Sequence, residues 1–185
     1  DVDFSLSSYS SDLDIDNFNF IFNFCPIGYN KNSYLIDVNF NKKSNNFDNN
    51  ITLNIKSKRP HFFTRHYNTS YSFDLNNFSH IKSASLSFKL NEAERLFSLS
   101  SFFNYYKNYL YFNNLASPVQ EYSPIVYFNL NLDKQWNIED FSFRSNLCVQ
   151  KSNSIILSLP SFLVYQRIQY KKYFAGNVKL LTAIN

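Results

Sequence analysis

The sequence predicts an α+β fold of antiparallel sheets with two helices. Through most of the 185 residues, apolar side chains alternate with polar ones, which is the pattern of strands that cover a core with one face. Two stretches depart from this alternation and place apolar residues at helical spacing. Each stretch follows several alternating segments, so the chain is expected to hold a duplicated unit of four strands and a helix.

The alternating segments are the predicted strands. The first is the clearest, because the four Phe residues between 18 and 24 share one face while Asn17, Asn19 and Asn23 lie on the other. The same period of two recurs along the chain. It covers residues 34–40, 51–55, 71–75, 84–90, 126–132, 141–143, 147–149 and 154–159.

The two helices are predicted from their start and stop signals. Asn91 followed three positions later by Glu94 is a capping pattern, and apolar residues then recur at helical spacing as far as about residue 109. Pro160 suits the first position of a second helix over residues 161–174, and Gly176 suits its end.

The charges divide the chain into an acidic leader, residues 1–15, and one β-rich domain, residues 16–185, with possible halves 16–112 and 113–185. Net charge is +4, but the first 24 residues hold five Asp and no Lys or Arg. The body is therefore basic and is expected to meet an anionic partner, with the leader free or covering a basic surface. A merely solubilising terminus is an equal alternative.

Residues 56–67, KSKRPHFFTRHY, form the main candidate site. Cations that can meet phosphates stand beside rings that can stack on bases, as in a groove for single-stranded nucleic acid. The predicted nucleic-acid contacts are Lys56, Lys58, Arg59, Phe62, Phe63, Arg65 and Tyr67, with a second group of Arg167, Lys171 and Lys172 on one side of the second helix. The alternatives are a basic strand end with Phe rings in the core, and a solvated helix face.

Other chemistry is not indicated. Glycine occurs only at positions 28 and 176, so no glycine-rich phosphate loop can form, and the three His show no metal-ligand spacing. No catalytic residue, cofactor or metal is expected, and Cys25 and Cys148 are interpreted as buried apolar residues. Because no run of 18 apolar residues occurs, no membrane span is expected.

Two passages run from a predicted strand into a predicted helix: 85–99, SLSFKLNEAERLFSL, and 154–168, SIILSLPSFLVYQRI. Two such units resemble the Whirly single-stranded-DNA-binding proteins of plant organelles and the guide-RNA-binding proteins of kinetoplastid mitochondria. The resemblance implies that nucleic acid would lie along strands and sheet edges. The Lys-Gly-Lys-Ala-Ala-Leu element of the plant proteins has no counterpart here.

The sequence therefore predicts a non-enzymatic mitochondrial protein that binds RNA or single-stranded DNA. It would act alone, as a homo-oligomer, or with other subunits in a ribonucleoprotein such as the mitochondrial ribosome. The 21 Phe and 14 Tyr indicate an A/T-rich genome, and much of the Asn content is attributed to the same codon bias. One alternative is a structural subunit of a large mitochondrial complex without nucleic-acid contact. Another is a secreted β-sandwich, since Asn50, Asn68 and Asn77 begin glycosylation triplets.

Overall fold

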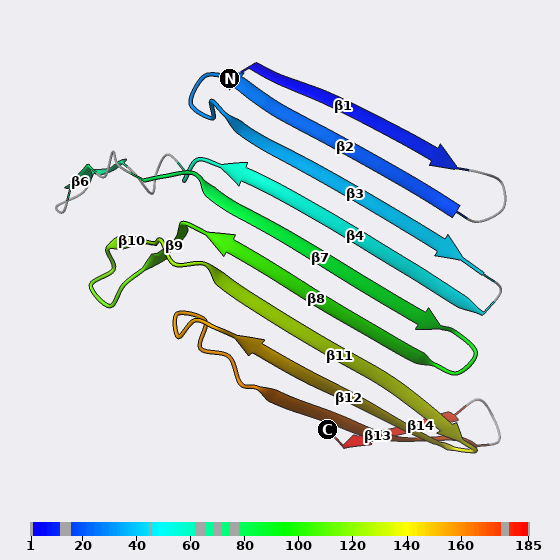
Figure 1. Ribbon diagram of the computed structural model, residues 1–185. Helices are drawn as coiled ribbons and strands as arrows, with labels where there is room; N and C mark the ends of the chain where they lie inside the picture. The colour runs from blue at the N-terminus through cyan, green and yellow to red at the C-terminus, as the bar shows by residue number, and fades with distance from the viewer. Residues whose placement is uncertain are drawn as a thin grey trace.

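A single antiparallel sheet of ten strands dominates the protein (Figure 1). The computed structural model describes residues 2–11, 16–44, 46–61, 66–68, 72–74, 78–174 and 178–184. The sheet order is β1-β2-β3-β4-β7-β8-β11-β12-β13-β14. Its strands are β1 (Val2–Ser11), β2 (Asp16–Ile27), β3 (Ser33–Lys43), β4 (Phe47–Lys58), β7 (Ile81–Glu92), β8 (Phe97–Lys107), β11 (Ile125–Ile138), β12 (Phe141–Ser152), β13 (Phe162–Phe174) and β14 (Val178–Ile184). The described residues form no helix, so the predicted α+β fold was wrong.

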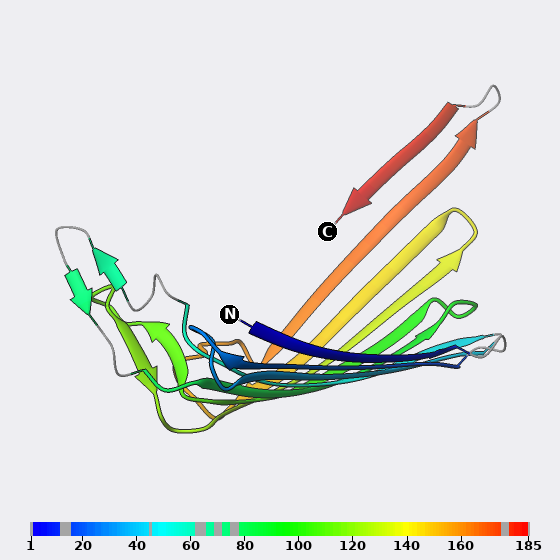
Figure 2. The same ribbon diagram turned by 90° about the horizontal axis from the view of Figure 1, so that it is seen from above.

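The strands follow one another up and down, and their connections differ at the two ends of the sheet. At the end we call the long-loop end, the chain connects strands through residues 28–32, 59–80, 108–124 and 153–161. Two of these connections carry small hairpins, β5 (His66–Asn68) with β6 (Ser72–Asp74), and β9 (Tyr109–Phe112) with β10 (Pro118–Glu121). At the opposite short-turn end, residues 44–46, 93–96 and 139–140 are enough to reverse the chain. Figure 2 shows that the sheet is curved, with β13 and β14 (orange and red) swung away from the first strands.

The first predicted helix is the end of β7, a four-residue turn and β8. Asn91 and Glu92 finish β7, and the turn places Leu96 at a φ of 48°, in the left-handed region. Helical spacing in this stretch was accidental, because Phe97, Leu99, Phe103 and Tyr105 fit a period of two equally well. The predicted capping pattern is therefore a reverse turn between antiparallel strands.

The second predicted helix is strand β13. Phe162, Val164, Ile168 and Tyr170 alternate along it, and β-branched and aromatic residues favour strands. Residues 154–159, predicted as a strand, belong instead to the connection between β12 and β13, where the Ser154 hydroxyl accepts a hydrogen bond from the Ile156 amide at 3.3 Å. Without helices, the duplicated unit of four strands and a helix does not exist.

The other predicted strands coincide with observed ones. The predicted acidic leader also contains a strand, since β1 pairs with β2 from Val2 to Ser11. Strands on both sides of residue 112 belong to one sheet, because β8 pairs with β11. The division into a leader and two halves stays a prediction.

Direct pairing across the sheet sorts the side chains into two faces. Directly paired residues point to the same side, and neighbours along a strand point to opposite sides. One row of direct pairs runs through Leu6, Phe22, Ile36, Ile55, Ala84, Tyr105 and Val126, and we call its side the apolar face. A row on the other side, the polar face, runs through Asn17, Asn41, Asn50, Lys89, Ser100, Asn131 and Cys148.

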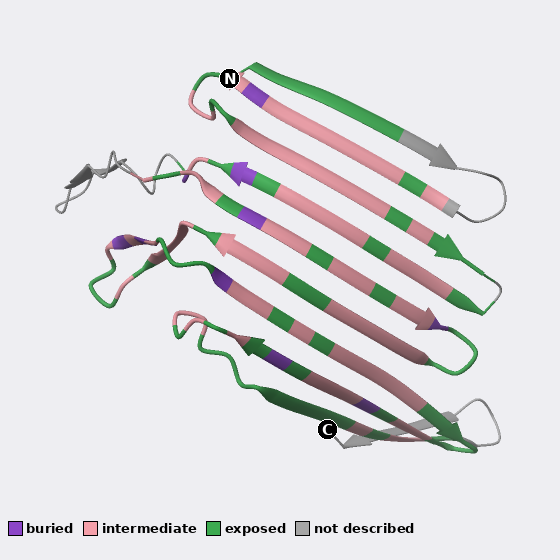
Figure 3. Ribbon diagram, in the orientation of Figure 1, coloured by how far each residue is buried: buried purple, intermediate pink, exposed green. Residues whose placement is uncertain are grey.

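No described element of the chain covers the apolar face. Among the described side chains, Cys25 and Ile125 are the only buried hydrophobic ones, and large apolar-face residues are exposed in the middle of the sheet (Figure 3). Examples are Leu86, Phe103, Phe128, Val149 and Phe162. The accessible surface of 13060 Å² exceeds the about 9,300 Å² expected for a folded monomer of 21.9 kDa. The described part of the chain thus lacks the core of a globular domain.

In the part of the chain that is described, no helix has the length and apolar character needed to cross a membrane.

The register predicts a specific engineered disulfide. Asn131 lies directly opposite Cys148 on the polar face, and directly opposed Cα atoms are about 4.5–5.5 Å apart, within the range of a disulfide. In a Cys25→Ser background, oxidation of Asn131→Cys should therefore form a disulfide with Cys148, so that neither thiol can be alkylated. Leu132→Cys is the matched control, because its side chain points to the opposite face and its thiols should stay reactive. Crosslinking in the control instead would mean that the register is shifted by one residue.

Candidate functional site

Amides, hydroxyls and charged groups predominate on the polar face, which also carries the exposed apolar residues Phe102 and Leu163. Between β3 and β4 the polar side chains bond to one another across the strands. The Asn39 amide donates to the Thr52 hydroxyl at 2.9 Å, and the Asn50 amide donates to Asn39 at 3.3 Å. The Asn54 amide donates to the Asp37 carboxylate at 2.8 Å. Such cross-strand pairs stabilise a sheet and leave a surface that water can wet.

A charged group lies farther along the same face, on β11, β12 and β13. Arg144 forms an ion pair with Asp133, with a guanidinium nitrogen 2.9 Å from a carboxylate oxygen and Nε at 3.0 Å. Asn146 donates to the same carboxylate at 3.3 Å. Arg167 lies directly opposite Arg144 in the neighbouring strand, and its Nε is buried without a hydrogen-bond partner. Like charges directly opposite each other destabilise a sheet, so Asp133 compensates for this arginine pair.

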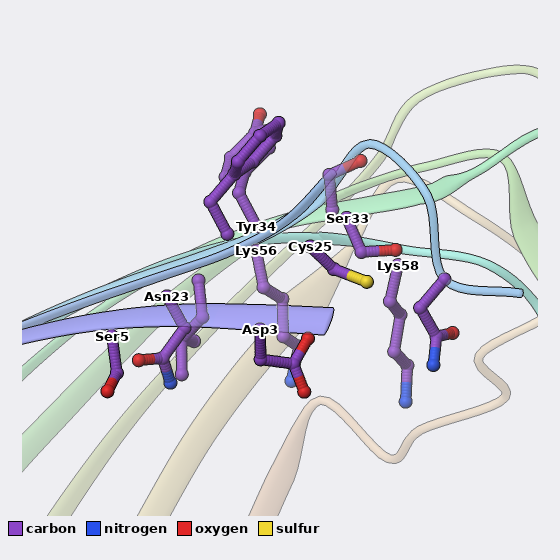
Figure 4. Close-up of a pocket in the computed structure, with 12 residues that line it drawn as sticks. Asp3, Ser5, Asn23, Cys25, Ser33, Tyr34, Lys56 and Lys58 are labelled. Atoms are coloured by element: carbon purple, nitrogen blue, oxygen red, sulfur yellow. The ribbon is translucent and has the colours of Figure 1, made fainter. Parts of the chain in front are cut away.

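An open hollow of about 460 Å³ lies on β1 to β4 near the long-loop end. It is lined by Asp3, Asn23, Lys56 and Lys58, among others. Figure 4 shows Asn23, Lys56 and Lys58 projecting to one side of the strands, whereas Tyr34 projects to the other. The two lysines occupy alternate positions of β4 and are exposed, so their charges are available to solutes over the polar face.

The connections at the long-loop end hold one another together. The Gln120 side chain is buried, donates to the carbonyls of Ser79 and Asn108 at 2.9 Å each, and accepts the Ser79 amide at 2.9 Å. The Tyr29 hydroxyl donates to the carbonyl of the fully buried Pro60 at 2.8 Å. In the same region, the amide of Ser123 donates to Glu121 at 2.8 Å and lowers the pKa of that carboxyl. The long connections are thus tied back onto the sheet.

Charged and aromatic side chains stand at the short-turn end of the apolar face. Lys134 lies 5.9 Å from the ring centroid of Trp136 and donates to the Arg95 carbonyl. The Trp136 ring is 5.3 Å from Phe143, and Arg95 pairs with Glu92 at 3.2 Å. A broad apolar surface that ends in aromatic rings and charges is typical of the outer wall of a membrane protein.

The structure separates the residues predicted to bind nucleic acid. Arg59 lies over the Tyr29 ring at 5.8 Å. Arg167 and Lys171 share the polar face of β13, but Lys172 lies on the apolar face. Phe62, Phe63 and Arg65 lie outside the described residues, as does the side chain of Tyr67. Among the described members of the predicted set, Lys56 and Lys58 alone line one hollow, and their binding role stays a prediction.

Comparison with known proteins decides the family. Residues 8–184 match the family described as "Putative porin". The chain belongs to this porin family. A search of curated proteins found no match.

Membership of the porin family corrects several predictions. The resemblance to Whirly and guide-RNA-binding proteins was wrong, because the family is different and the strand-and-helix unit is absent. The predicted function, a mitochondrial RNA- or single-stranded-nucleic-acid-binding protein or ribonucleoprotein subunit, is overturned by the same match, and with it the predicted partners and location. The predicted absence of a membrane span is not confirmed. The predicted non-enzymatic character stays a prediction.

One signal in the sequence could have indicated the polar face. Segments of about ten residues with alternating polarity, separated by turns, are the pattern of strands in outer-membrane porins. The sequence interpretation assumed instead that helices cover the apolar side. It also attributed the Asn residues to codon bias, although Asn39, Asn50 and Asn54 are bonded members of the polar face.

The Asp133–Arg144 pair predicts a non-additive effect on stability. Asp133→Asn leaves Arg144 and Arg167 opposed without compensation, so it should lower the free energy of unfolding by about 1 kcal/mol. Arg144→Gln removes one of the opposed charges together with the ion pair, and the double variant Asp133→Asn/Arg144→Gln should be more stable than Asp133→Asn alone. Urea unfolding of the detergent-solubilised protein measures all three variants. Equal stability of Asp133→Asn and the unmodified protein would contradict the compensating role of Asp133.

Proposed function

We propose that the chain forms the wall of a water-filled pore across an outer membrane. The apolar face would lie against lipid and the polar face would line the aqueous passage. The observation that carries this proposal is the division of one ten-stranded sheet into an uncovered apolar face and a hydrogen-bonded polar face. Membership of the porin family supports the same function.

The apolar face has the height of a bilayer core. On β7 its apolar stretch, Ala84 to Leu90, is bounded by Lys82 and Glu92, which are ten residues apart. At about 3.3 Å per residue they are about 33 Å apart along the strand. A strand tilted by about 40° converts this to about 25 Å along the membrane normal, the usual height of the apolar band of an outer-membrane protein.

The slope of the apolar band gives the tilt independently. Direct pairs lead from Phe18 on β2 through seven strand intervals to Phe162 on β13. Phe18 is at the short-turn end of the band on β2, whereas Phe162 is at the long-loop end of the band on β13. Relative to this row of direct pairs, the middle of the apolar band therefore shifts along the strands by about seven residues over the seven intervals. One residue per strand corresponds to a tilt of about 35° for strands about 4.8 Å apart.

The unequal connections agree with a porin. Strands of outer-membrane porins are joined by short turns on one side of the membrane and by longer loops on the other. Here, turns as short as residues 139–140 alternate with connections as long as residues 59–80. Passage through such a pore needs no covalent step, so the non-enzymatic character is part of the proposal.

The proposed function predicts ion conductance. The protein purified in detergent and added to a planar lipid bilayer should increase the current in discrete steps, because each insertion opens an aqueous path. Heat-denatured protein is the control. A preparation that keeps its β-sheet circular dichroism but never conducts would exclude a pore.

The single Trp reports which face meets lipid. Trp136 is 43% exposed on the apolar face, so lipids with brominated acyl chains should quench its fluorescence and aqueous iodide should quench it little. In the matched variant Trp136→Phe/Asn137→Trp the ring moves to the polar face and the two quenchers should exchange roles. If iodide quenched Trp136 more strongly than the lipids did, the assignment of the faces would be reversed.

A further inference from the structure

The polar face carries more cations than carboxylates. Of the described side chains on this face, seven are basic and four are acidic. The basic ones are Lys43, Lys56, Lys58, Lys89, Arg144, Arg167 and Lys171, and the acidic ones are Asp3, Asp37, Asp48 and Asp133. A pore lined by this face would therefore have a positive wall.

Two of these carboxylates lie beside a cation of the same face, and a third accepts a hydrogen bond from a neutral amide and keeps its charge. Asp37 accepts the amide of Asn54 at 2.8 Å. Asp133 is paired with Arg144 at 2.9 Å, and Asp48 lies directly opposite Lys43. With these two pairs set aside, five cations remain against Asp3 and Asp37, because a pair of opposite charges contributes little to the field elsewhere on the face.

Part of the excess lies at the long-loop end, whereas Lys43, Lys89 and Lys171 lie toward the short-turn end. Lys56 and Lys58 line the hollow over β1 to β4, where Asp3 is the single acidic lining residue. In the described part of the protein, no ion pair joins either lysine to a carboxylate. Arg59 follows them in the chain, and Lys31 is exposed in the turn between β2 and β3. All of these lie where a solute from the long-loop side would enter.

We propose that Lys56 and Lys58 form an anion-attracting site at the long-loop mouth and make the pore selective for small anions. This inference rests on the proposed pore function. Rings of Lys or Arg select anions in pores, because they raise the local concentration of anions and lower that of cations. Two lysines within about 8 Å of a passing ion, about one Debye length at physiological salt, act together on it.

Reversal potentials in a potassium chloride gradient test the site. The unmodified protein in a planar bilayer should show chloride permeability about threefold above that of potassium, the effect expected of two screened charges at this distance. Lys56→Glu/Lys58→Glu should invert the preference, and Lys56→Gln/Lys58→Gln should bring the ratio toward one. Lys82→Glu is the matched control, because Lys82 is at the same end of the sheet on the apolar face and should leave the ratio unchanged.

The outcomes separate this inference from the pore itself. A conducting protein that prefers potassium would overturn the anion site and leave the pore standing. The same follows if the chloride-to-potassium permeability ratio of both double variants equals that of the unmodified protein. If Lys82→Glu changed the permeability ratio as much as the double variants do, the selectivity would come from general surface charge. That outcome would also overturn the site. A folded protein without any conductance would remove the pore and the inference together. The glutamine pair keeps the test valid if the glutamate pair fails to fold.

Discussion

The structure depends on one constraint: among the described residues, the apolar side of the sheet has nothing to pack against. A sheet with one apolar face normally buries it under a second sheet or a layer of helices. Here, the described residues supply neither, and exposed Phe and Leu side chains extend across most of the strands. A lipid bilayer is a solvent in which such a face is stable, provided that the backbone is paired within the sheet. The alternation of polarity, the long regular strands and the scarcity of buried side chains all follow from this single requirement.

Most strands could be located from the sequence, but the architecture could not. The Phe residues from 18 to 24 indicate a strand because alternate positions of an extended chain share a face, and this holds in lipid as in water. The helices were predicted wrongly because an apolar face in water has to be covered by other parts of the protein. Once helices were expected, the spacing of Leu96 and Phe103 was read as helical, although it also fits a turn followed by a strand. Local periodicity cannot distinguish a face that meets protein from one that meets hydrocarbon.

The candidate site was predictable only in part. Lys56 and Lys58 could be found from charge clustering, since alternate lysines on a strand point the same way. The rest of the polar face could not, because each of its residues is ordinary by itself. Asn39, Asp37 and Arg144 become part of one surface only through pairing between strands, and the register is a property of the whole sheet. A surface of this kind has no local motif.

The first and last strands of the sheet have a further consequence for how the protein exists in a membrane. β1 and β14 each have one neighbour, so their outer backbone amides and carbonyls lack ladder partners. Hydrocarbon penalises each such group by several kcal/mol. In the bilayer these two edge strands must therefore pair with each other or with an additional strand. Any strand that joins them has to keep the same stagger as its neighbours, because otherwise its hydrophobic belt would no longer be level with theirs.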